Sequence, residues 1–502
     1  MAKTLISRVI NAFEGESPYT NIILYMSCLG ASQMSLNSIL RVMADAEHSL
    51  AGITKTVREA LDLMRRWGYG HSESLQHIVK NSGNRLVSEL FKRLDYAVKA
   101  GVSVKDFAKI EFQKYLALSQ VEFEKNLEKL KRIVEAYTTL LSTTSLLAVS
   151  FLLISIIFGT SDPSEILEIS AAVILSTLSS SSLLFLTTNL RRRLFHREAT
   201  RPESLYILER LTIPLLILSF FTLAFKFVYP NPLENRGFSI LFYSALGGGP
   251  VLIHGFLGRR WHKKVGNIEE SLSILIRSLG DYIAVSGSLR SASKLMLLND
   301  FGPLNNLLAR MEVRVRAGIN HALSLKMLGV ETLSNLGHRI LRMMGEMLEA
   351  GSKPSETGGI LSDYVAYTLA MDKRRRQVTS SLKWMSVPLH ATLAAILALM
   401  GTLMEIISDI ASLLAVRIVL INPLDVSLAT DYFYIILVGI SFITSVNILL
   451  ADGDSVFTFT FYFGLLLLVG GVTFLAMSTV SHNILSSFSR LTESISGLAG
   501  GG

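Results

Sequence analysis

The chain has 502 residues, of which 50% are apolar and 18% are charged, and its formal net charge is +8. This composition is too apolar for an ordinary soluble protein of that length and too charged for one buried wholly in lipid, so it predicts membrane spans joined to water-exposed domains. Without a recognisable nucleic-acid-binding motif, the basic excess indicates cationic flanks of membrane spans and argues against a nucleic-acid partner.

The first region of the chain has the sequence pattern of a soluble helical domain. Residues 1–17 contain no long apolar run, so we expect no cleavable signal peptide and a cytoplasmic N-terminal region. Apolar residues recur at helical spacing between charged ones in Val121–Tyr137, and no run alternates as a strand would. In Gly68-Tyr69-Gly70-His71-Ser72, the first glycine predicts a helix end, and a new helix is expected to begin at Ser72 or Glu73.

Seven later segments are apolar enough and long enough to cross the hydrocarbon core of a bilayer, which takes about 20 residues. They are Leu140–Phe158, Ile166–Leu190, Leu211–Val228, Phe238–Leu257, Val387–Ile406, Tyr432–Leu450 and Val456–Met477. A short apolar stretch, Ala411–Ile421, holds Arg417 and is either interfacial or re-entrant. The sequence therefore predicts an all-α polytopic membrane protein with about seven spans, and at most nine.

The distribution of lysine and arginine between the loops predicts the orientation of these spans. The first loop, Gly159–Glu165, has no cation, and Tyr229–Gly237 has only Arg236. The loop between spans two and three is rich in arginine, and a basic run follows span four. Because basic loops stay in the cytoplasm, both soluble regions are expected on that side. The expected division is a helical region at 1–137, four spans at 138–257, a second helical region at 258–384, three or more spans at 385–480, and a flexible tail at 481–502.

The two soluble regions repeat one another. Gly68 and Gly101 are separated by 33 residues, as are Gly318 and Gly351. Upstream, residues 29–35 parallel residues 283–288, and each region runs through a basic helix into a span. Two glycine pairs could arise by chance, but the shared order of soluble bundle, basic flank and span indicates an internal repeat.

This order resembles the type II secretion F-domain superfamily, and in particular its archaeal members, which serve archaella and adhesive pili. The resemblance spans nearly the whole chain. It rests on the order of several short segments along the chain more than on any one motif. These segments are Leu24-Tyr25-Met26-Ser27, Ala31-Ser32-Gln33-Met34-Ser35, Gly68-Tyr69-Gly70, Ala100-Gly101, Ala350-Gly351 and Leu450-Ala451-Asp452-Gly453-Asp454.

The resemblance implies a non-enzymatic platform in the cytoplasmic membrane, with two F-type repeats on the cytoplasmic side. Its implied partners are a hexameric secretion-type ATPase in the cytoplasm, pilin- or archaellin-like subunits and a second copy of the chain. Two basic clusters are candidate contacts for an acidic face of the ATPase, although they also fit lipid-facing flanks of spans. Their members are Arg259, Arg260, Lys263, Lys264, Lys373, Arg374, Arg375 and Arg376.

No catalytic, cofactor-binding or metal-binding residues are predicted. The single cysteine, Cys28, excludes an intrachain disulfide and a cysteine-based zinc site. Gly287–Lys294 has the length of a phosphate-binding loop but lacks its second glycine. Ala451-Asp452-Gly453-Asp454 approaches the Gly-x-Gly-Asp of intramembrane aspartic peptidases, but it lacks the first glycine and a partner aspartate within a span.

A secondary transporter or channel with cytoplasmic regulatory domains is the alternative function. Gly247-Gly248-Gly249-Pro250 is expected to interrupt the fourth span, and broken spans are typical of transporters. Ionisable residues within or near the spans mark sites where protons or ions could pass, although structural roles are expected for most of them. These residues are Glu168, Lys226, His254, His390 and Glu405.

Overall fold

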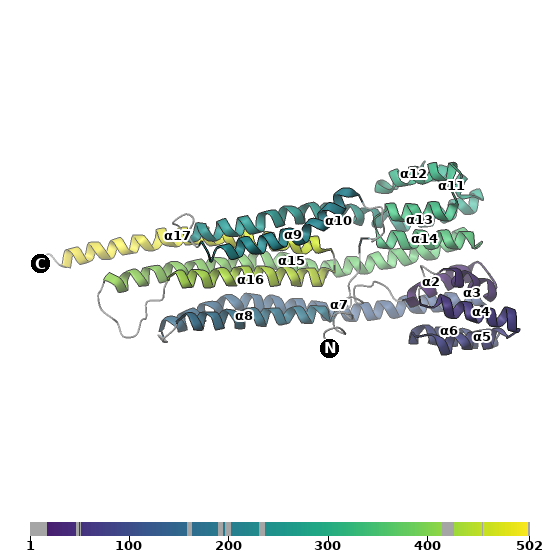
Figure 1. Cartoon of the computed structure of the whole chain (residues 1–502), viewed down its shortest axis with the longest axis horizontal. Helices are drawn as coiled ribbons and strands as arrows, with labels where there is room; N and C mark the ends of the chain where they lie inside the picture. Colours follow the sequence, from purple (N-terminus) through teal and green to yellow (C-terminus); the bar gives the residue numbers. More distant parts are fainter. Residues whose placement is uncertain are drawn as a thin grey trace. The chain divides into compact units, whose positions relative to one another are not determined.

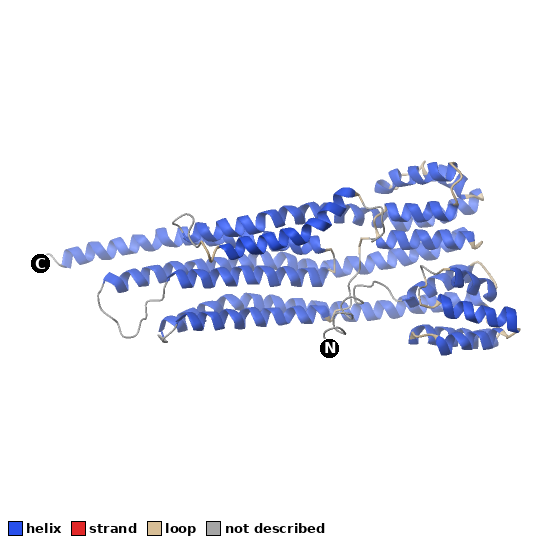
Figure 2. Ribbon diagram, in the orientation of Figure 1, coloured by secondary structure: helices blue, strands red, loops and turns tan. Residues whose placement is uncertain are grey.

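The computed structural model describes residues 18–46, 50, 52–157, 163–188, 194–195, 202–229, 236–413, 426–453 and 455–499. Within these residues the chain forms helices and loops and contains no strand (Figure 2). One isolated backbone bridge joins Phe195 to Ser334. The expected all-α fold is confirmed. The stretch 414–425, which holds most of the possible re-entrant segment, lies outside the described residues.

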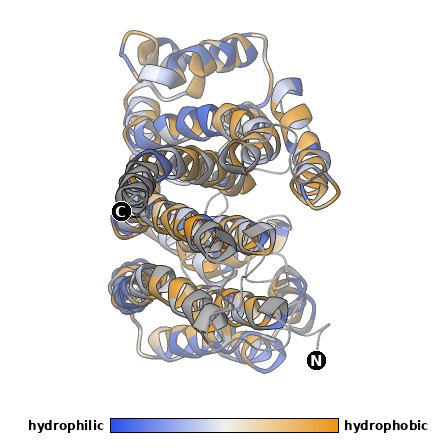
Figure 3. Ribbon diagram, turned by 90° about the vertical axis from the view of Figure 1, so that its left-hand side faces the viewer, coloured by the Kyte–Doolittle hydropathy of each residue, from blue (hydrophilic) through white to orange (hydrophobic). Residues whose placement is uncertain are grey.

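Short helices precede and separate the long ones along the chain (Figure 1). The first group comprises α2 (Pro18–Ala31), α3 (Leu36–Asp45), α4 (Thr54–Trp67), α5 (His71–Asn81) and α6 (Arg85–Lys99). The second group comprises α11 (Leu289–Met296), η1 (Gly302–Leu304), α12 (Asn305–Arg316), α13 (His321–Glu331) and α14 (Asn335–Glu349). Figure 3 shows hydrophobic and hydrophilic residues intermixed along the helices that it draws.

Seven helices in the described part of the chain are long and apolar enough to cross a membrane, which confirms the seven expected spans. They are α7 (Val104–Ile157), α8 (Pro163–Leu186), α9 (Glu203–Phe225), α10 (Arg236–Ser286), α15 (Pro354–Leu413), α16 (Val426–Asp452) and α17 (Val456–Ala499). The chain is therefore a multi-pass membrane protein.

The chain divides into two compact units. Unit 1 comprises residues 1–125, 192–202 and 262–374, and unit 2 comprises residues 126–191, 203–261 and 375–502. The division falls within α7, α10 and α15, so each of these helices contributes its soluble part to unit 1 and its apolar part to unit 2.

Unit 1 contains the internal repeat, and its two copies are shifted by 250 positions. Helices α5 and α13 both have 11 residues, and they begin at His71 and His321. Helices α6 and α14 both have 15 residues, and they begin at Arg85 and Asn335. Equal lengths at one constant shift mean that the repeat extends to the boundaries of individual helices.

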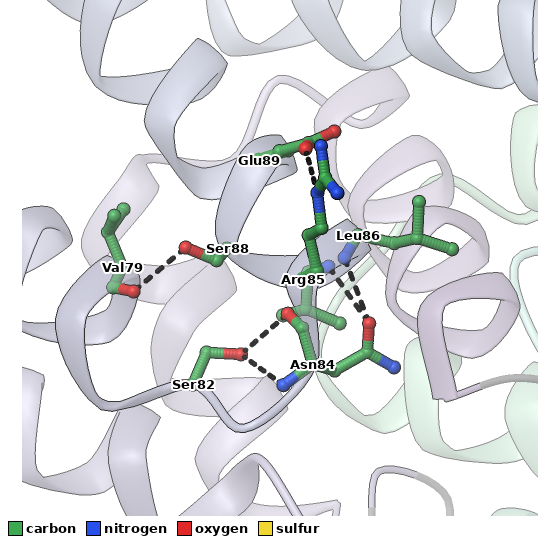
Figure 4. A network of polar contacts seen from close by, with 8 residues as sticks. Val79, Ser82, Asn84, Arg85, Leu86, Ser88 and Glu89 are labelled. Atoms are coloured by element: carbon green, nitrogen blue, oxygen red, sulfur yellow. Dashed lines mark hydrogen bonds and ion pairs between the residues drawn. The ribbon is translucent and has the colours of Figure 1, made fainter.

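Side-chain caps set several of these boundaries. Between α5 and α6, the Asn84 side chain accepts hydrogen bonds from the backbone N–H of Leu86 at 2.9 Å and of Val87 at 3.5 Å (Figure 4). The Ser88 hydroxyl donates to the carbonyl of Val79 at 2.8 Å. Capping groups satisfy the N–H groups that a helix start leaves without partners. Helix α5 begins at His71, one or two residues before the expected start at Ser72 or Glu73, and the Glu73 carboxylate accepts from the N–H of Gly70 at 2.5 Å.

A single hydrophobic core holds both copies of the repeat together. Helix α2 is apolar on nearly all sides and almost wholly buried, because it packs against α3 and α6 of its own copy and against α14 of the other. The Tyr25 hydroxyl donates to the Glu346 carboxylate, and the backbone N–H of Lys353 donates to the Ser32 hydroxyl at 2.8 Å. The two copies therefore form one folded body.

Small residues allow close packing of α10 against α17 in unit 2. A Cβ placed on Gly248 would lie 3.2 Å from the carbonyl oxygen of Gly464, and one placed on Gly464 would lie 2.6 Å from that of Gly248. A Cβ on Gly255 would lie 2.3 Å from the backbone nitrogen of Phe461. Lipid offers no hydrophobic drive for helices to associate, so spans depend on close contact of this kind.

Helix α10 runs unbroken through residues 247–250, so the expectation that these residues interrupt the fourth span is wrong. Proline removes one backbone donor, but in lipid a broken helix would leave several backbone groups without partners, at a cost of several kcal/mol each. Two of the three glycines before Pro250 serve packing: a Cβ on Gly247 would meet Leu223 at 2.9 Å, and one on Gly248 would meet Leu467 at 3.0 Å.

Candidate functional site

The first predicted basic cluster lies on α10, and part of it is fixed to aromatic rings. The guanidinium carbon of Arg259 lies 4.2 Å from the centre of the Phe461 ring, and that of Arg260 lies 4.9 Å from the centre of the Phe256 ring. Contacts of this kind stabilise by about 0.5–2 kcal/mol. Both arginines belong to unit 2. The other members of the cluster are exposed and belong to unit 1: Lys263 and Lys264.

The second basic cluster, on α15, divides in the same way. Lys373 and Arg374 belong to unit 1 and are exposed, although Arg374 Nη1 lies 2.9 Å from Glu124 Oε1. Arg375 and Arg376 belong to unit 2, where Arg376 is half-buried and Arg375 is only 2% exposed. Arg375 is therefore buried within the protein, and a partner protein could not reach it without disturbing the surrounding structure.

The four repeat-defining glycines shape turns of the backbone. Gly68, Gly101, Gly318 and Gly351 have φ angles of +70°, +73°, +86° and +83°, and each follows the end of a helix. This left-handed conformation suits glycine, because a side chain would clash there. At three of these turns, the backbone N–H of the residue after the glycine donates to the carbonyl five residues earlier: Val102 to Ala97, Ile319 to Arg314 and Ser352 to Met347.

The two glycine turns of the second copy lie side by side, since the Asn320 side chain donates to Glu349 at 2.6 Å. The Ser32–Lys353 hydrogen bond brings the turn between α2 and α3 to the same end of unit 1. This turn-rich end is a surface that the sequence pattern did not single out.

Two aromatic side chains flank the Gly68 turn and face solvent. Trp67 is 73% exposed and Tyr69 is 50% exposed. The preceding residues, Arg65 and Arg66, are exposed as well. Tryptophan, tyrosine and arginine dominate the binding energy of many protein interfaces, so this turn is a candidate contact site. The sequence could have indicated this site, because Trp67 and Tyr69 flank a turn and lie outside the apolar stripe of α4.

Asp452, of the loop that resembles a peptidase motif, is fixed in an ion pair. Its carboxylate accepts from Lys383 Nζ at 2.6 Å and from Thr379 Oγ1 at 2.9 Å. An aspartic peptidase needs two carboxylates that share a proton, whereas here the neighbour is a cation. Asp454 lies outside the described residues. This geometry argues against the peptidase hypothesis.

The other ionisable residues of unit 2 have polar neighbours on adjacent helices. Lys226, which is almost wholly buried, forms an ion pair with Asp431 at the start of α16. His254 Nε2 lies 2.9 Å from the carbonyl oxygen of Leu208, and His390 Nε2 lies 3.0 Å from Ser441 Oγ. Helix α16 thus has one ion-paired aspartate at each end, Asp431 and Asp452, and a polar contact from Ser441 to His390 between them. Glu168 is exposed on α8, and Glu405 is half-buried on α15.

A metal centre would need several ligands close together. Among the residues that the structure describes, no group of three or more histidine, cysteine, aspartate or glutamate side chains is placed to hold a metal ion. Cys28 is buried in the core of unit 1.

Comparison with known proteins gives one informative similarity. The chain is 22% identical over 451 residues to flagella accessory protein J of Methanocaldococcus jannaschii, and the match covers 87% of this chain and 79% of that protein. No family model matches the chain, and no solved structure matches it. The similarity covers both units, so it concerns the whole architecture.

Proposed function

We propose that this chain is a non-enzymatic platform in the cytoplasmic membrane for assembly of an archaellum or a related pilus-like filament. The observation that carries the proposal is the similarity to flagella accessory protein J over 87% of the chain. A repeated helical unit joined to seven apolar helices suits a protein that binds one partner in water and another within the bilayer.

In this proposal a separate cytoplasmic ATPase supplies the energy, because the sequence has no phosphate-binding loop of its own. Unit 1 would receive the ATPase, and unit 2 would guide filament subunits out of the bilayer. The long helices α7, α10 and α15 have 54, 51 and 60 residues. At 1.5 Å per residue they are about 80, 75 and 90 Å long. An unbroken helix can carry a displacement along its length without any chemistry.

The proposed contact with the ATPase uses the exposed members of the basic clusters: Lys263, Lys264, Lys373 and Arg374. The aromatic turn at Trp67 and Tyr69 is a second proposed contact, because it is exposed and flanked by arginines. Structural roles are assigned to the members of the clusters that contact aromatic rings or are at least half-buried: Arg259, Arg260, Arg375 and Arg376.

The test is affinity purification of the tagged full-length protein from its native membranes, with identification of the proteins that accompany it. A secretion-type ATPase and pilin- or archaellin-like subunits are expected, at levels well above those found with an unrelated multi-pass membrane protein. If neither accompanies an abundant, folded preparation, the platform hypothesis is wrong. Substrate-dependent flux in proteoliposomes would then support the transporter.

The contact residues are tested by two variants of the same protein. Replacing Lys263, Lys264 and Lys373 by glutamate, or replacing Trp67 by alanine, should each reduce recovery of the ATPase several-fold. The matched control is Leu298→Ala, because Leu298 is 82% exposed elsewhere in unit 1. An equal loss with the control would mean that the effect is not specific to these contacts.

A further inference from the structure

A chain of polar and aromatic contacts crosses the first copy of the repeat in unit 1. Arg93 of α6 donates to the Glu111 carboxylate of α7 from Nε at 2.9 Å and from Nη2 at 2.7 Å. Arg93 Nη2 also lies 3.5 Å from the Tyr19 hydroxyl of α2, and the Tyr19 ring lies with its centre 6.0 Å from that of the Tyr115 ring. The Tyr115 hydroxyl lies 2.8 Å from Thr20 Oγ1. Tyr115, on α7, thus ends the part of the chain that belongs to the first copy.

The second copy continues this chain at Tyr364 of α15. A side-chain hydrogen bond joins Tyr115 to Tyr364, which is 3% exposed. The Tyr364 hydroxyl also accepts a hydrogen bond from Arg339 Nη2 of α14 at 3.1 Å. The two tyrosines therefore connect α7 of the first copy to α15 of the second, with an arginine at each end of the chain.

The fold of the repeat does not require these polar groups. Glu111 is only 7% exposed, so its ion pair with Arg93 is largely buried. In the second copy, the positions equivalent to Arg93, Glu111 and Tyr115 hold apolar residues that are wholly buried in the core. At the shift of 250 positions they are Met343, Leu361 and Val365. Replacing a buried ion pair by apolar residues often leaves stability unchanged or raises it, so stability alone does not account for the polar groups of the first copy.

The contact between α7 and α15 has a defined register. Glu124 Oε1 lies 2.9 Å from Arg374 Nη1, and these two residues are equivalent positions, 250 apart. Tyr115 and Tyr364 are 249 positions apart, so the two helices run parallel over several turns. Apolar contacts are not directional, so they discriminate poorly between alignments that differ by one helical turn, about 5.4 Å. Hydrogen bonds discriminate well, because a slide would leave buried polar groups without partners.

We propose that this polar chain is a register lock, which holds α7 and α15 in the alignment that pairs Glu124 with Arg374. Polar groups at positions that could be apolar can select one helix alignment over others. The two helices are unbroken over 54 and 60 residues, so a slide in unit 1 would displace their apolar parts as well. The lock therefore prevents the two helices from moving along one another. This inference concerns a contact within one molecule and does not depend on the proposed function.

Disulfide trapping in the full-length protein tests the lock. Glu124→Cys with Arg374→Cys reports the observed alignment. Glu124→Cys with Ala370→Cys reports a slide of one turn in one direction. Gln120→Cys with Arg374→Cys reports a slide of one turn in the other. The ion pair that the cysteines replace is about half-exposed and contributes little, and Cys28 is buried. With the lock intact, the aligned pair should cross-link at least tenfold faster than either displaced pair.

The lock is removed by giving the first copy the residues of the second: Arg93→Met, Glu111→Leu and Tyr115→Val in one protein. The tenfold preference for the aligned pair should then fall below threefold, while the unfolding temperature in detergent stays close to that of the wild type. An unchanged preference would overturn the proposal, because the remaining contacts would then fix the alignment. Loss of every cross-link together with a lower unfolding temperature would also overturn it, because the chain would then be needed for folding itself.

A milder variant removes a single oxygen atom from the chain. Tyr115→Phe deletes the hydroxyl that contacts Thr20 and keeps the ring, so the displaced pairs should cross-link several-fold faster than in the wild type. The matched control is Tyr96→Phe, which makes the same change on α6 in a side chain that is 57% exposed. Equal rates of displaced cross-linking in the two variants would contradict the lock.

Discussion

Asp452, the last residue of α16, accepts a hydrogen bond from the ammonium group of Lys383 on α15 at 2.6 Å. Thr379 donates to the other carboxylate oxygen of Asp452 at 2.9 Å. The carboxylate is 1% exposed and the lysine side chain is 17% exposed, so the pair is largely shielded from water. At the opposite end of α16, Asp431 pairs with Lys226. Helix α16 is therefore joined to its neighbours by an ion pair at each end.

The first prediction concerns the two partners of this pair. Asp452→Asn or Lys383→Met alone should reduce the stability of unit 2 by about 3–5 kcal/mol, because each leaves one buried charge without its partner. The double variant should be less destabilised than the worse single variant. Thermal unfolding of the purified proteins in detergent gives the comparison. Additive losses would mean that the two residues act independently.

The second prediction concerns adjacent glycines on α15. A Cβ on Gly358 would lie 2.9 Å from the carbonyl oxygen of Ile276 and 3.0 Å from the Cα of Gly280, both on α10. Because these atoms are backbone, no side chain can move aside. Gly358→Ala should therefore destabilise unit 1 by about 1–3 kcal/mol.

Gly359 provides the control for this prediction, since a Cβ there would meet nothing within 4 Å. Gly359→Ala should leave stability unchanged or raise it by up to about 1 kcal/mol, because alanine favours a helix. The unfolding temperature of Gly358→Ala should fall below that of the wild type, whereas that of Gly359→Ala should not. Equal effects would show that α10 and α15 are not in close contact at Gly358.

Much of the fold could be predicted from local sequence signals. Runs of about 20 apolar residues have few stable alternatives to a membrane helix, and each of the seven predicted spans overlaps a long helix. Gly68 marked a helix end because a left-handed turn strongly favours glycine. The prediction that residues 247–250 would interrupt a span was wrong for a related reason. Glycine and proline report local preference, whereas the surrounding lipid and the packing against α17 decide in favour of a continuous helix.

The candidate site was harder to predict, because exposure depends on tertiary packing. Lys373 and Arg375 are indistinguishable in a run of four basic residues, yet one is exposed and the other is buried. Their positions on α15 relative to its neighbours make the difference. Trp67 has a large apolar side chain of the kind that usually lies in a core, and only the folded structure reveals that it faces solvent.

The third prediction concerns the pH dependence of unit 1. Burial alone raises the pKa of the Asp95 carboxyl, but hydrogen bonds from the side chains of Ser72, Lys99 and Gln76 outweigh it and lower the pKa below its usual value. A lowered pKa in the folded state stabilises the protein above the unfolded pKa, about 3.9 for aspartate. That contribution is lost as the pH falls through the folded pKa.

Asp95→Asn should therefore reduce the stability of unit 1 by about 1 kcal/mol at pH 7. The difference from the wild type should shrink below about pH 3.9. Thermal unfolding of the full-length protein, followed by circular dichroism at pH 7, 5 and 3, gives the measurement. The control is Asp62→Asn, because the Asp62 side chain is 51% exposed. A constant difference between Asp95→Asn and the wild type at all three values would contradict the assignment.

The fourth prediction concerns the side of the membrane on which unit 1 lies. Cys28 is the only cysteine, and its burial raises the pKa of its thiol, so the wild-type protein should not react with a maleimide that cannot cross membranes.

Arg66 and Tyr229 are both exposed in the structure. In intact cells, Tyr229→Cys should be labelled, whereas Arg66→Cys should be labelled only after the membrane is opened. The basic loops predict that position 66 lies in the cytoplasm and position 229 outside. Reversed labelling would put unit 1 outside the cell, where no cytoplasmic ATPase could reach it. The platform proposal would then fail even though the fold of the chain was unchanged.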